Sequence, residues 1–146
     1  MYSFLVRMDN EKENLLKEKY TELRLIDQQI RQIQKQLQDL ENQIIEIMYV
    51  QQSLDELKNV KNGTEILVPV SNGIFAKAAL KENNDLLVNV GANTVVEKDV
   101  DSVKKMLETN INEIKKLEQY FLQELQKLGL QATSIEKEMN SLMSEK

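Results

Sequence analysis

The side chains that could carry out chemistry in this sequence are carboxylates, lysines and tyrosines, because its 146 residues include no Cys and no His. Their absence excludes Cys/His zinc sites, disulfides, cysteine nucleophiles and Ser-His-Asp relays. Acidic pairs such as Glu11 and Glu13 have the groups needed for general acid–base catalysis, but similar pairs cover the solvated faces of many helices. We therefore expect no catalytic residues, no metal site and no enzymatic activity.

Sites for nucleotides, nucleic acids and membranes are not indicated either. The four glycines at positions 63, 73, 91 and 129 are scattered and match neither phosphate-binding fingerprint, so we expect no cofactor. The chain has 19 basic and 24 acidic residues, a net charge of −5 without a basic stripe, which argues against nucleic acid as a partner. No apolar run approaches the roughly 18 residues of a membrane span, so we expect no membrane partner and a cytoplasmic location.

The first third of the chain has the repeat of a coiled coil. From about Asp9 to Asn59 it contains no Gly and no Pro, and apolar residues recur every seven positions in two interleaved rows. Residues 9–59 are therefore predicted to form a helix about 75 Å long. The two rows are Leu16, Leu23, Ile30, Leu37 and Ile44, and Ile26, Ile33, Leu40, Ile47 and Leu54.

The last third mirrors the first. Apolar residues again keep a spacing of seven, and residues 100–144 are predicted to form a second helix about 68 Å long. Two helices of nearly equal length, joined by a compact insert, fold back most simply as an antiparallel coiled-coil hairpin. The seven-residue row of this helix is Leu107, Ile114, Phe121, Leu128, Ile135 and Leu142.

Between the helices, residues 61–98 change to a period of two, which is typical of β-strands. Strands are expected on either side of a tight turn at Gly73 and on either side of a second turn at Gly91. The predicted strands are residues 64–70, 74–80, 85–90 and 94–98. The expected fold class is thus α+β and mainly α, a long two-helix coiled-coil hairpin with two central β-hairpins.

The two predicted β-hairpins require a partner. Isolated hairpins are only marginally stable, and their unpaired edges are templates for pairing with another chain. Pro69 cannot donate a hydrogen bond to a neighbouring strand, so we expect its strand to expose one side or to lie at an edge. We therefore expect an obligate oligomer that completes its sheet with strands of other subunits. The residues expected to form this oligomerisation surface are Ile66, Leu67, Val68, Val70, Ile74, Phe75, Leu86, Val88, Val90, Val95 and Val96.

The central segment resembles that of prefoldin subunits of the α class, also called GimC α. The resemblance rests on Glu65–Val70 with Gly73 in the first turn, on Leu86–Gly91 and on Val95–Lys98, with heptad helices on both sides. Its specific part spans residues 65–98, and the presence of two hairpins, where the β class has one, favours the α class. Residues 1–146 are therefore interpreted as one prefoldin-like unit with the three parts 9–59, 61–98 and 100–144.

The resemblance implies a molecular chaperone of the holdase type that works without ATP. Members of the family assemble two α-type with four β-type subunits, and their hairpins build an intersubunit β-barrel platform that carries six coiled coils. The tips of the coiled coils hold unfolded client proteins and pass them to a group II chaperonin. The alternative is a structural coiled-coil protein, an α-like subunit that self-assembles through its β segment into homo-oligomers or filaments.

The client-binding tips are expected where the two termini meet, at the end of the helical hairpin opposite the sheet. Seam residues run out of partners there, and the flexible thioether of Met suits a surface that adapts to many clients. A frayed end without binding function is the other interpretation of the same residues. The expected tip residues are Phe4, Leu5, Val6, Met8, Leu15, Leu16, Ile135, Met139, Leu142 and Met143.

Overall fold

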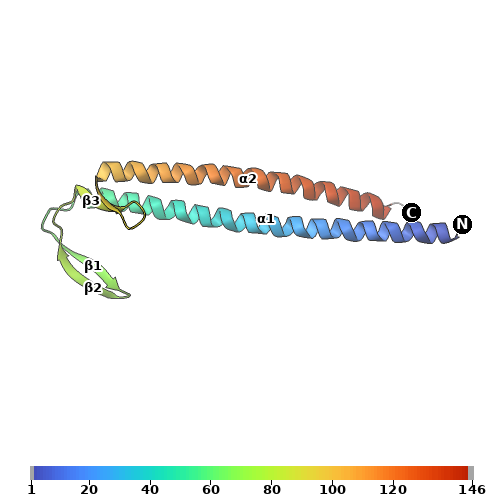
Figure 1. The fold of residues 1–146 in the computed structure, drawn as a ribbon, viewed down its shortest axis with the longest axis horizontal. Helices are drawn as coiled ribbons and strands as arrows, with labels where there is room; N and C mark the ends of the chain where they lie inside the picture. The colour runs from blue at the N-terminus through green and yellow to red at the C-terminus, as the bar shows by residue number, and fades with distance from the viewer. Residues whose placement is uncertain (1, 145–146) are drawn as a thin grey trace. The chain divides into compact units, whose positions relative to one another are not determined.

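The computed structural model describes residues 2–144, without the side chains of Tyr2 and Phe4. It contains two long helices and two small antiparallel hairpins and is mainly α, which confirms the predicted fold class (Figure 1). The elements in chain order are α1 (Tyr2–Lys58), β1 (Glu65–Ser71), β2 (Ile74–Ala79), β3 (Asp85–Asn89), β4 (Val95–Asp99) and α2 (Val100–Ser144).

Both helices are long because nothing in their sequences stops them. No Gly or Pro interrupts the apolar residues before Asp9, and α1 therefore begins at Tyr2, seven residues earlier than expected. The bounds of α2 are those predicted from the heptads. Within residues 2–144, neither helix has an apolar stretch sufficient to cross a membrane.

The chain divides into two compact units. The terminal unit combines Met1–Glu41 with Lys115–Lys146, and the central unit is Asn42–Ile114. In the terminal unit, Lys19 Nζ of α1 lies 2.5 Å from Glu138 Oε2 of α2, and this hydrogen bond raises the pKa of Lys19. Leu40 and Leu128 are the buried apolar residues of this unit within the part of the chain described.

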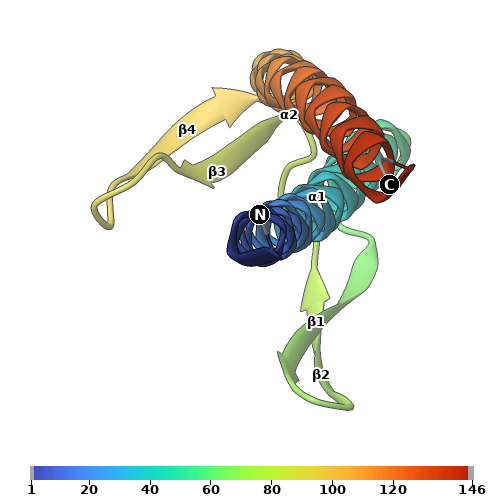
Figure 2. The same ribbon diagram turned by 90° about the vertical axis from the view of Figure 1, so that its right-hand side faces the viewer.

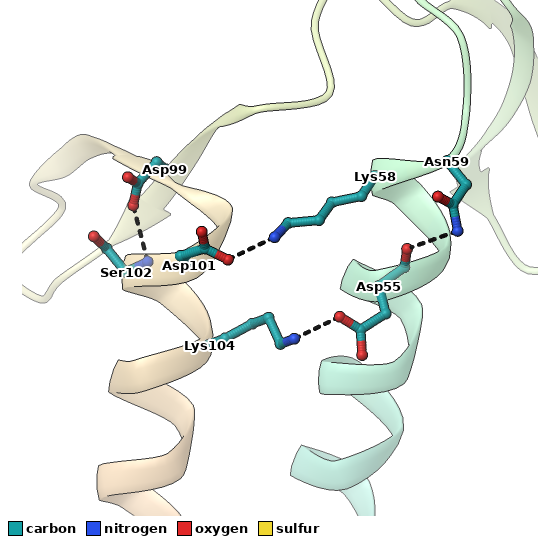
Figure 3. Close-up of polar contacts among 7 residues, drawn as sticks. All are labelled: Asp55, Lys58, Asn59, Asp99, Asp101, Ser102 and Lys104. Carbon is teal, nitrogen blue, oxygen red and sulfur yellow. Dashed lines mark hydrogen bonds and ion pairs between the residues drawn. The ribbon is translucent and has the colours of Figure 1, made fainter.

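In the central unit, two ion pairs join the facing ends of the helices. Lys58 Nζ lies 2.5 Å from Asp101 Oδ1, and Lys104 Nζ lies 2.5 Å from Asp55 Oδ1. Both contacts are drawn in Figure 3. From the first ion pair to the second, the residue number falls on α1, from 58 to 55, and rises on α2, from 101 to 104. The two helix segments are therefore antiparallel. Each pair is largely exposed, and exposed pairs set geometry more than they add stability. The buried apolar residues of the central unit are Ile44, Val100, Val103 and Ile111, of which only Val100 has no exposed surface at all.

The four strands form two separate two-stranded sheets. β1 pairs with β2 and β3 with β4, both antiparallel, and the first pair contains a bulge between Pro69 and Ser71. The tight turns depend on positive φ angles at Gly73 (75°) and Gly91 (112°), which glycine adopts without steric cost. All four strands begin and end within one residue of the predicted positions. Figure 2 shows the two hairpins leaving the helices in different directions.

Asn83, in the link between the two hairpins, closes the end of α1. Its Nδ2 donates to the carbonyl oxygens of Lys58 (3.0 Å) and Val60 (2.7 Å). The last carbonyls of a helix have no partner inside the helix, so a side chain that binds two carbonyls at this end satisfies groups that would otherwise need water. The neighbouring Asn84 accepts a hydrogen bond from the backbone N–H of Val100 (3.0 Å). The link therefore ties the end of α1 to the start of α2.

Asp99 caps the beginning of α2. Its Oδ1 accepts a hydrogen bond from the backbone N–H of Ser102 at 2.8 Å, the arrangement of an N-cap residue (Figure 3). Hydrogen bonds from Ser102, first its hydroxyl and then its backbone N–H, lower the pKa of Asp99 below the ordinary 3.8, with a smaller contribution from Lys58 and Lys105. A lowered folded-state pKa means that the carboxylate stabilises the fold above pH 3.8 and that this stabilisation disappears as the pH falls through the folded-state pKa.

We therefore expect Asp99→Ala to lower the urea midpoint of unfolding at pH 7, and Asp99→Asn to recover most of the loss, because Asn also caps helices well. As the pH is lowered from 6 to 3, the wild type should lose stability relative to Asp99→Asn, since only the Asp cap titrates. Urea unfolding followed by circular dichroism at several pH values measures both effects. A constant difference between wild type and Asp99→Asn over this range would contradict the assignment.

Candidate interaction surfaces

One face of the first hairpin is mostly apolar. Strand pairing places Ile66 opposite Ala78 and Val68 opposite Ala76. Ile74 continues this face on β2 by alternation and pairs with Ser71, beside Val70 at the bulge. Val70 is 67% exposed and Ile74 is 61% exposed. We call this surface the β1–β2 apolar face. It consists of Ile66, Val68, Val70, Ile74, Ala76 and Ala78.

The opposite face of the same hairpin is mixed. Pro69 pairs with Phe75 and Leu67 pairs with Lys77, and both Leu67 and Phe75 are exposed. A two-stranded sheet with large apolar side chains on both faces buries neither of them without additional elements. Pro69 also lacks the N–H that a continuing ladder would need, which restricts where a further strand can pair.

The second hairpin is apolar in its middle. Leu86, Val88 and Val96 lie on one face and are half-buried, whereas Leu87 and Val95 lie on the other face and are exposed. Leu87, at 77%, was not among the predicted oligomerisation residues. The sequence could have indicated this residue, because Leu87 lies between Leu86 and Val88 in a predicted strand, and alternation places it on the opposite face. Val90, just after β3, is exposed as well.

Three exposed carboxylates lie close together at the base of the second hairpin. Glu82, Asp85 and Glu97 each have a carboxylate oxygen within 4.8 Å of such an oxygen of the other two. The charge of Asp85 raises the pKa of Glu82, followed by partial burial and a hydrogen bond with Asp85. A raised folded-state pKa favours the fold at low pH and loses that advantage as the pH rises through it. At neutral pH the three carboxylates therefore repel one another.

The expected tip residues within the terminal unit form grooves between α1 and α2. Leu16 lines a groove of about 490 Å³ with Met139 and Met143, and Leu15 lines one of about 520 Å³ with Leu142. A third groove, of about 480 Å³, is lined by Ile135, together with other residues of both helices. The structure thus brings six of the expected residues together across the two helices.

The remaining expected tip residues stand apart from these grooves. Leu5, Val6 and Met8 are exposed on α1 and line none of the described grooves, and the side chain of Phe4 lies outside the described part of the chain. Tyr20 and Leu25 are exposed and line grooves of the same unit, although they were not predicted. Both stand between seam positions, where a heptad pattern gives no reason to expect an apolar contact. We use the name terminal surface for the expected tip residues described here together with Tyr20 and Leu25, which make up part of the exposed or groove-lining apolar surface of this unit: Leu5, Val6, Met8, Leu15, Leu16, Tyr20, Leu25, Ile135, Met139, Leu142 and Met143.

The arrangement of two heptad helices around two hairpins is matched by a known family. The family of prefoldin subunits matches residues 26–145, which is most of the chain. The chain belongs to the prefoldin family. Prefoldin is a family of chaperones and not of enzymes, which agrees with the absence of a catalytic constellation from the sequence.

Relatives support the α class of prefoldin subunits. The chain is similar to prefoldin subunits alpha of Methanococcus aeolicus (28% identical over 88 residues, 60% of this chain and 59% of the relative) and Methanococcus vannielii (25% over 124 residues, 85% and 83%). It is also similar to that of Archaeoglobus fulgidus (26% over 132 residues, 90% and 95%). The match thus spans less than two thirds of the first relative and most of the other two. The resemblance to α-class prefoldin subunits is confirmed.

A solved structure shares the prefoldin fold. The filamentous PFD of Methanocaldococcus jannaschii, determined by cryo-electron microscopy, superposes with a TM-score of 0.73 and 21% sequence identity, covering 79% of this chain and 95% of that one. At this identity the likeness concerns the fold.

The exposed strand faces predict that the isolated chain self-associates. Burying one aliphatic side chain contributes about 1.5–3 kcal/mol, so Val70→Lys together with Ile74→Lys should weaken association by about 100-fold or more. Analytical ultracentrifugation over a range of concentrations measures the change, and circular dichroism checks that the helices remain. Lys77→Glu, on the mixed face, is the matched control and should associate like the wild type. Unchanged association of the double variant would contradict a role for the β1–β2 apolar face.

Proposed function

We propose that this chain is the α subunit of a prefoldin holdase, which binds non-native proteins through the terminal surface without ATP and passes them to a group II chaperonin in the cytoplasm. The observation that carries the proposal is the terminal surface itself, in which apolar side chains of both helices remain open along several grooves. Membership of the prefoldin family supports it.

The terminal surface suits weak binding of many different clients. Met143 is 58% exposed beside the half-buried Met139, and thioether side chains adapt their shape to irregular apolar partners. Burial of one such side chain contributes about 1.5–3 kcal/mol before ordering costs, so a single coiled-coil tip binds weakly and reversibly. Several tips on one platform then add avidity without requiring a sequence motif in the client.

The hairpins are proposed to supply the platform. In this proposal residues 1–146 act as one prefoldin-like unit, and the strand segment 61–98 pairs with strands of β-class subunits, in an assembly of two α and four β chains. The unpaired edges and exposed apolar residues of both hairpins support this assignment, since they are unstable in water unless other subunits pair with or cover them. Release needs no nucleotide if a chaperonin competes for the same client surface.

A second candidate function is a self-assembling scaffold. The observation in its favour is the fold shared with a PFD described as filamentous, together with hairpin edges that could pair with further copies of the chain. In this case the same strand residues join identical subunits, and the terminal surface decorates a homo-oligomer or filament.

Substitutions on the terminal surface test the holdase proposal. We expect Leu15→Ser with Met143→Ser to reduce the protection that the assembled complex gives to an aggregating model protein, because two apolar contacts of each α tip are lost. Light scattering of the client during thermal unfolding measures protection, and size-exclusion chromatography checks that assembly is unchanged. Gln34→Ser with Gln36→Ser, on the exposed polar part of α1, is the matched control. Full protection by the Leu15/Met143 variant would contradict the assignment of the tips.

The native mass of the complex separates the two candidates. Isolated from its own cells, the chain should be found in a hexamer with two copies of itself and four smaller coiled-coil subunits. Native mass spectrometry gives the stoichiometry, and negative-stain electron microscopy distinguishes discrete particles from filaments. A homo-oligomer or polymer would instead favour the scaffold.

A further inference from the structure

The exposed apolar side chains of α1 gather in two separate stretches. Within the described residues, large apolar side chains of α1 are exposed between residues 5 and 25 and again between 45 and 50, whereas none is exposed among residues 26–44. The first stretch belongs to the terminal surface. The second lies in the central unit, in the same unit as the hairpins.

The second stretch forms a stripe on one side of the helix. Ile45, Met48 and Tyr49 follow the spacing of residues that share a helix face, and Tyr49 is 71% exposed. They line a groove of about 550 Å³, whose other walls are polar side chains of α1. We call these three residues the α1 stripe.

Packing against α2 does not explain the α1 stripe. The seam toward α2 uses Ile44 and Ile47, which are buried and half-buried. On α2, none of the large apolar residues from position 100 to 114 is exposed, so the two helices of the central unit differ in this respect. An apolar stripe on one helix only, away from the seam, indicates a contact that the single chain does not make.

The β1–β2 apolar face has the matching chemistry. It belongs to the same unit, presents mainly aliphatic side chains, and is connected to α1 by the short segment 59–64. Figure 2 shows the β1–β2 hairpin on the α1 side of the helices and the β3–β4 hairpin on the α2 side. Within one chain, both the α1 stripe and this face remain exposed, so neither covers the other.

The size of the two surfaces favours a second copy as the partner. Three stripe residues and six residues of the face are far fewer than the roughly 20–30 residues per side of a standard interface. A free client or an unrelated protein would not be held by so small a contact. A second copy offers both surfaces at once, so that a two-fold arrangement uses each of them twice and adds to contacts already made by the strands.

We propose that the α1 stripe is the docking site for the β1–β2 apolar face of a second copy of this chain. The inference rests on the proposed assembly through the strands and extends the subunit interface from the strands onto helix α1. In such a contact the ring of Tyr49 covers aliphatic side chains of the hairpin, and its hydroxyl stays at the solvated edge of the groove.

Site-specific crosslinking tests the contact. Tyr49→benzoylphenylalanine is introduced into the full chain, which is assembled with an equal amount of ¹⁵N-labelled wild-type chain and with any subunits that co-purify. After irradiation, mass spectrometry of the oligomer should find crosslinks from position 49 to residues 66–76 of the labelled copy. The same photoreactive group in place of Asn112, an exposed polar residue of α2 in the same unit, is the matched control and should not reach these residues.

A second variant gives an independent measure. Tyr49→Lys should leave the helix signal in circular dichroism unchanged, because the side chain is largely exposed, and should speed dissociation of the oligomer by about ten-fold. Crosslinks from position 49 to its own copy, to a different subunit, to a client or to nothing overturn the inference. If the chain does not assemble through its strands at all, both this inference and the proposed platform fail, whereas an intact oligomer without the crosslink contradicts this inference alone.

Discussion

A β-hairpin of two strands cannot bury its own side chains. Each hairpin of this chain has two faces and two outer edges. Its two strands are hydrogen-bonded to each other, and no further strand pairs with either outer edge among the described residues. The aliphatic residues on β1, β2 and β3 therefore remain in water unless another element covers them. The other features of the central unit, from its small core around Val100 to the exposed stripe on α1, are consistent with a unit that completes its packing in an assembly.

Polar contacts hold the central unit together where its core is small. Two ion pairs, Lys58 with Asp101 and Lys104 with Asp55, align the facing helices. The side chain of Asn83 binds the last carbonyl of α1, and Asp99 is the N-cap of α2. None of these groups is deeply buried, so each contributes direction more than stability. Their common effect is to place both hairpins at the facing ends of the two helices.

The sequence was sufficient to predict the helices and the strands, because both depend on periodicity. A spacing of seven identifies a seam and a spacing of two identifies a strand, and the strands were located to within one residue. Residues off the main pattern were missed. Strand alternation could have assigned Leu87 to the second face of its hairpin, whereas no periodic row marks Tyr49, whose exposure becomes visible only when the packed faces are known.

Contacts between residues far apart in the sequence could not be predicted either. In the sequence, Asn83 has no feature that distinguishes it from other loop residues. Its two hydrogen bonds to the end of α1 form only because the folded loop brings it there. The start of α1 was placed too late because the prediction began at Asp9, although nothing in the preceding residues breaks a helix. The oligomerisation and tip residues remain predictions, since partners and clients decide them.

The two hairpins are attached to the helices by connections of unequal length. Segment 59–64 separates α1 from β1, whereas β4 ends at Asp99 and α2 begins at Val100 with no residue between them. Asp99 is therefore both the last ladder residue of a strand and the cap of a helix. A single inserted residue at this boundary would turn the helix by about 100° relative to the strand and move its seam away from α1. The orientation of the second hairpin is thus coupled directly to that of α2, whereas segment 59–64 lies between the first hairpin and α1.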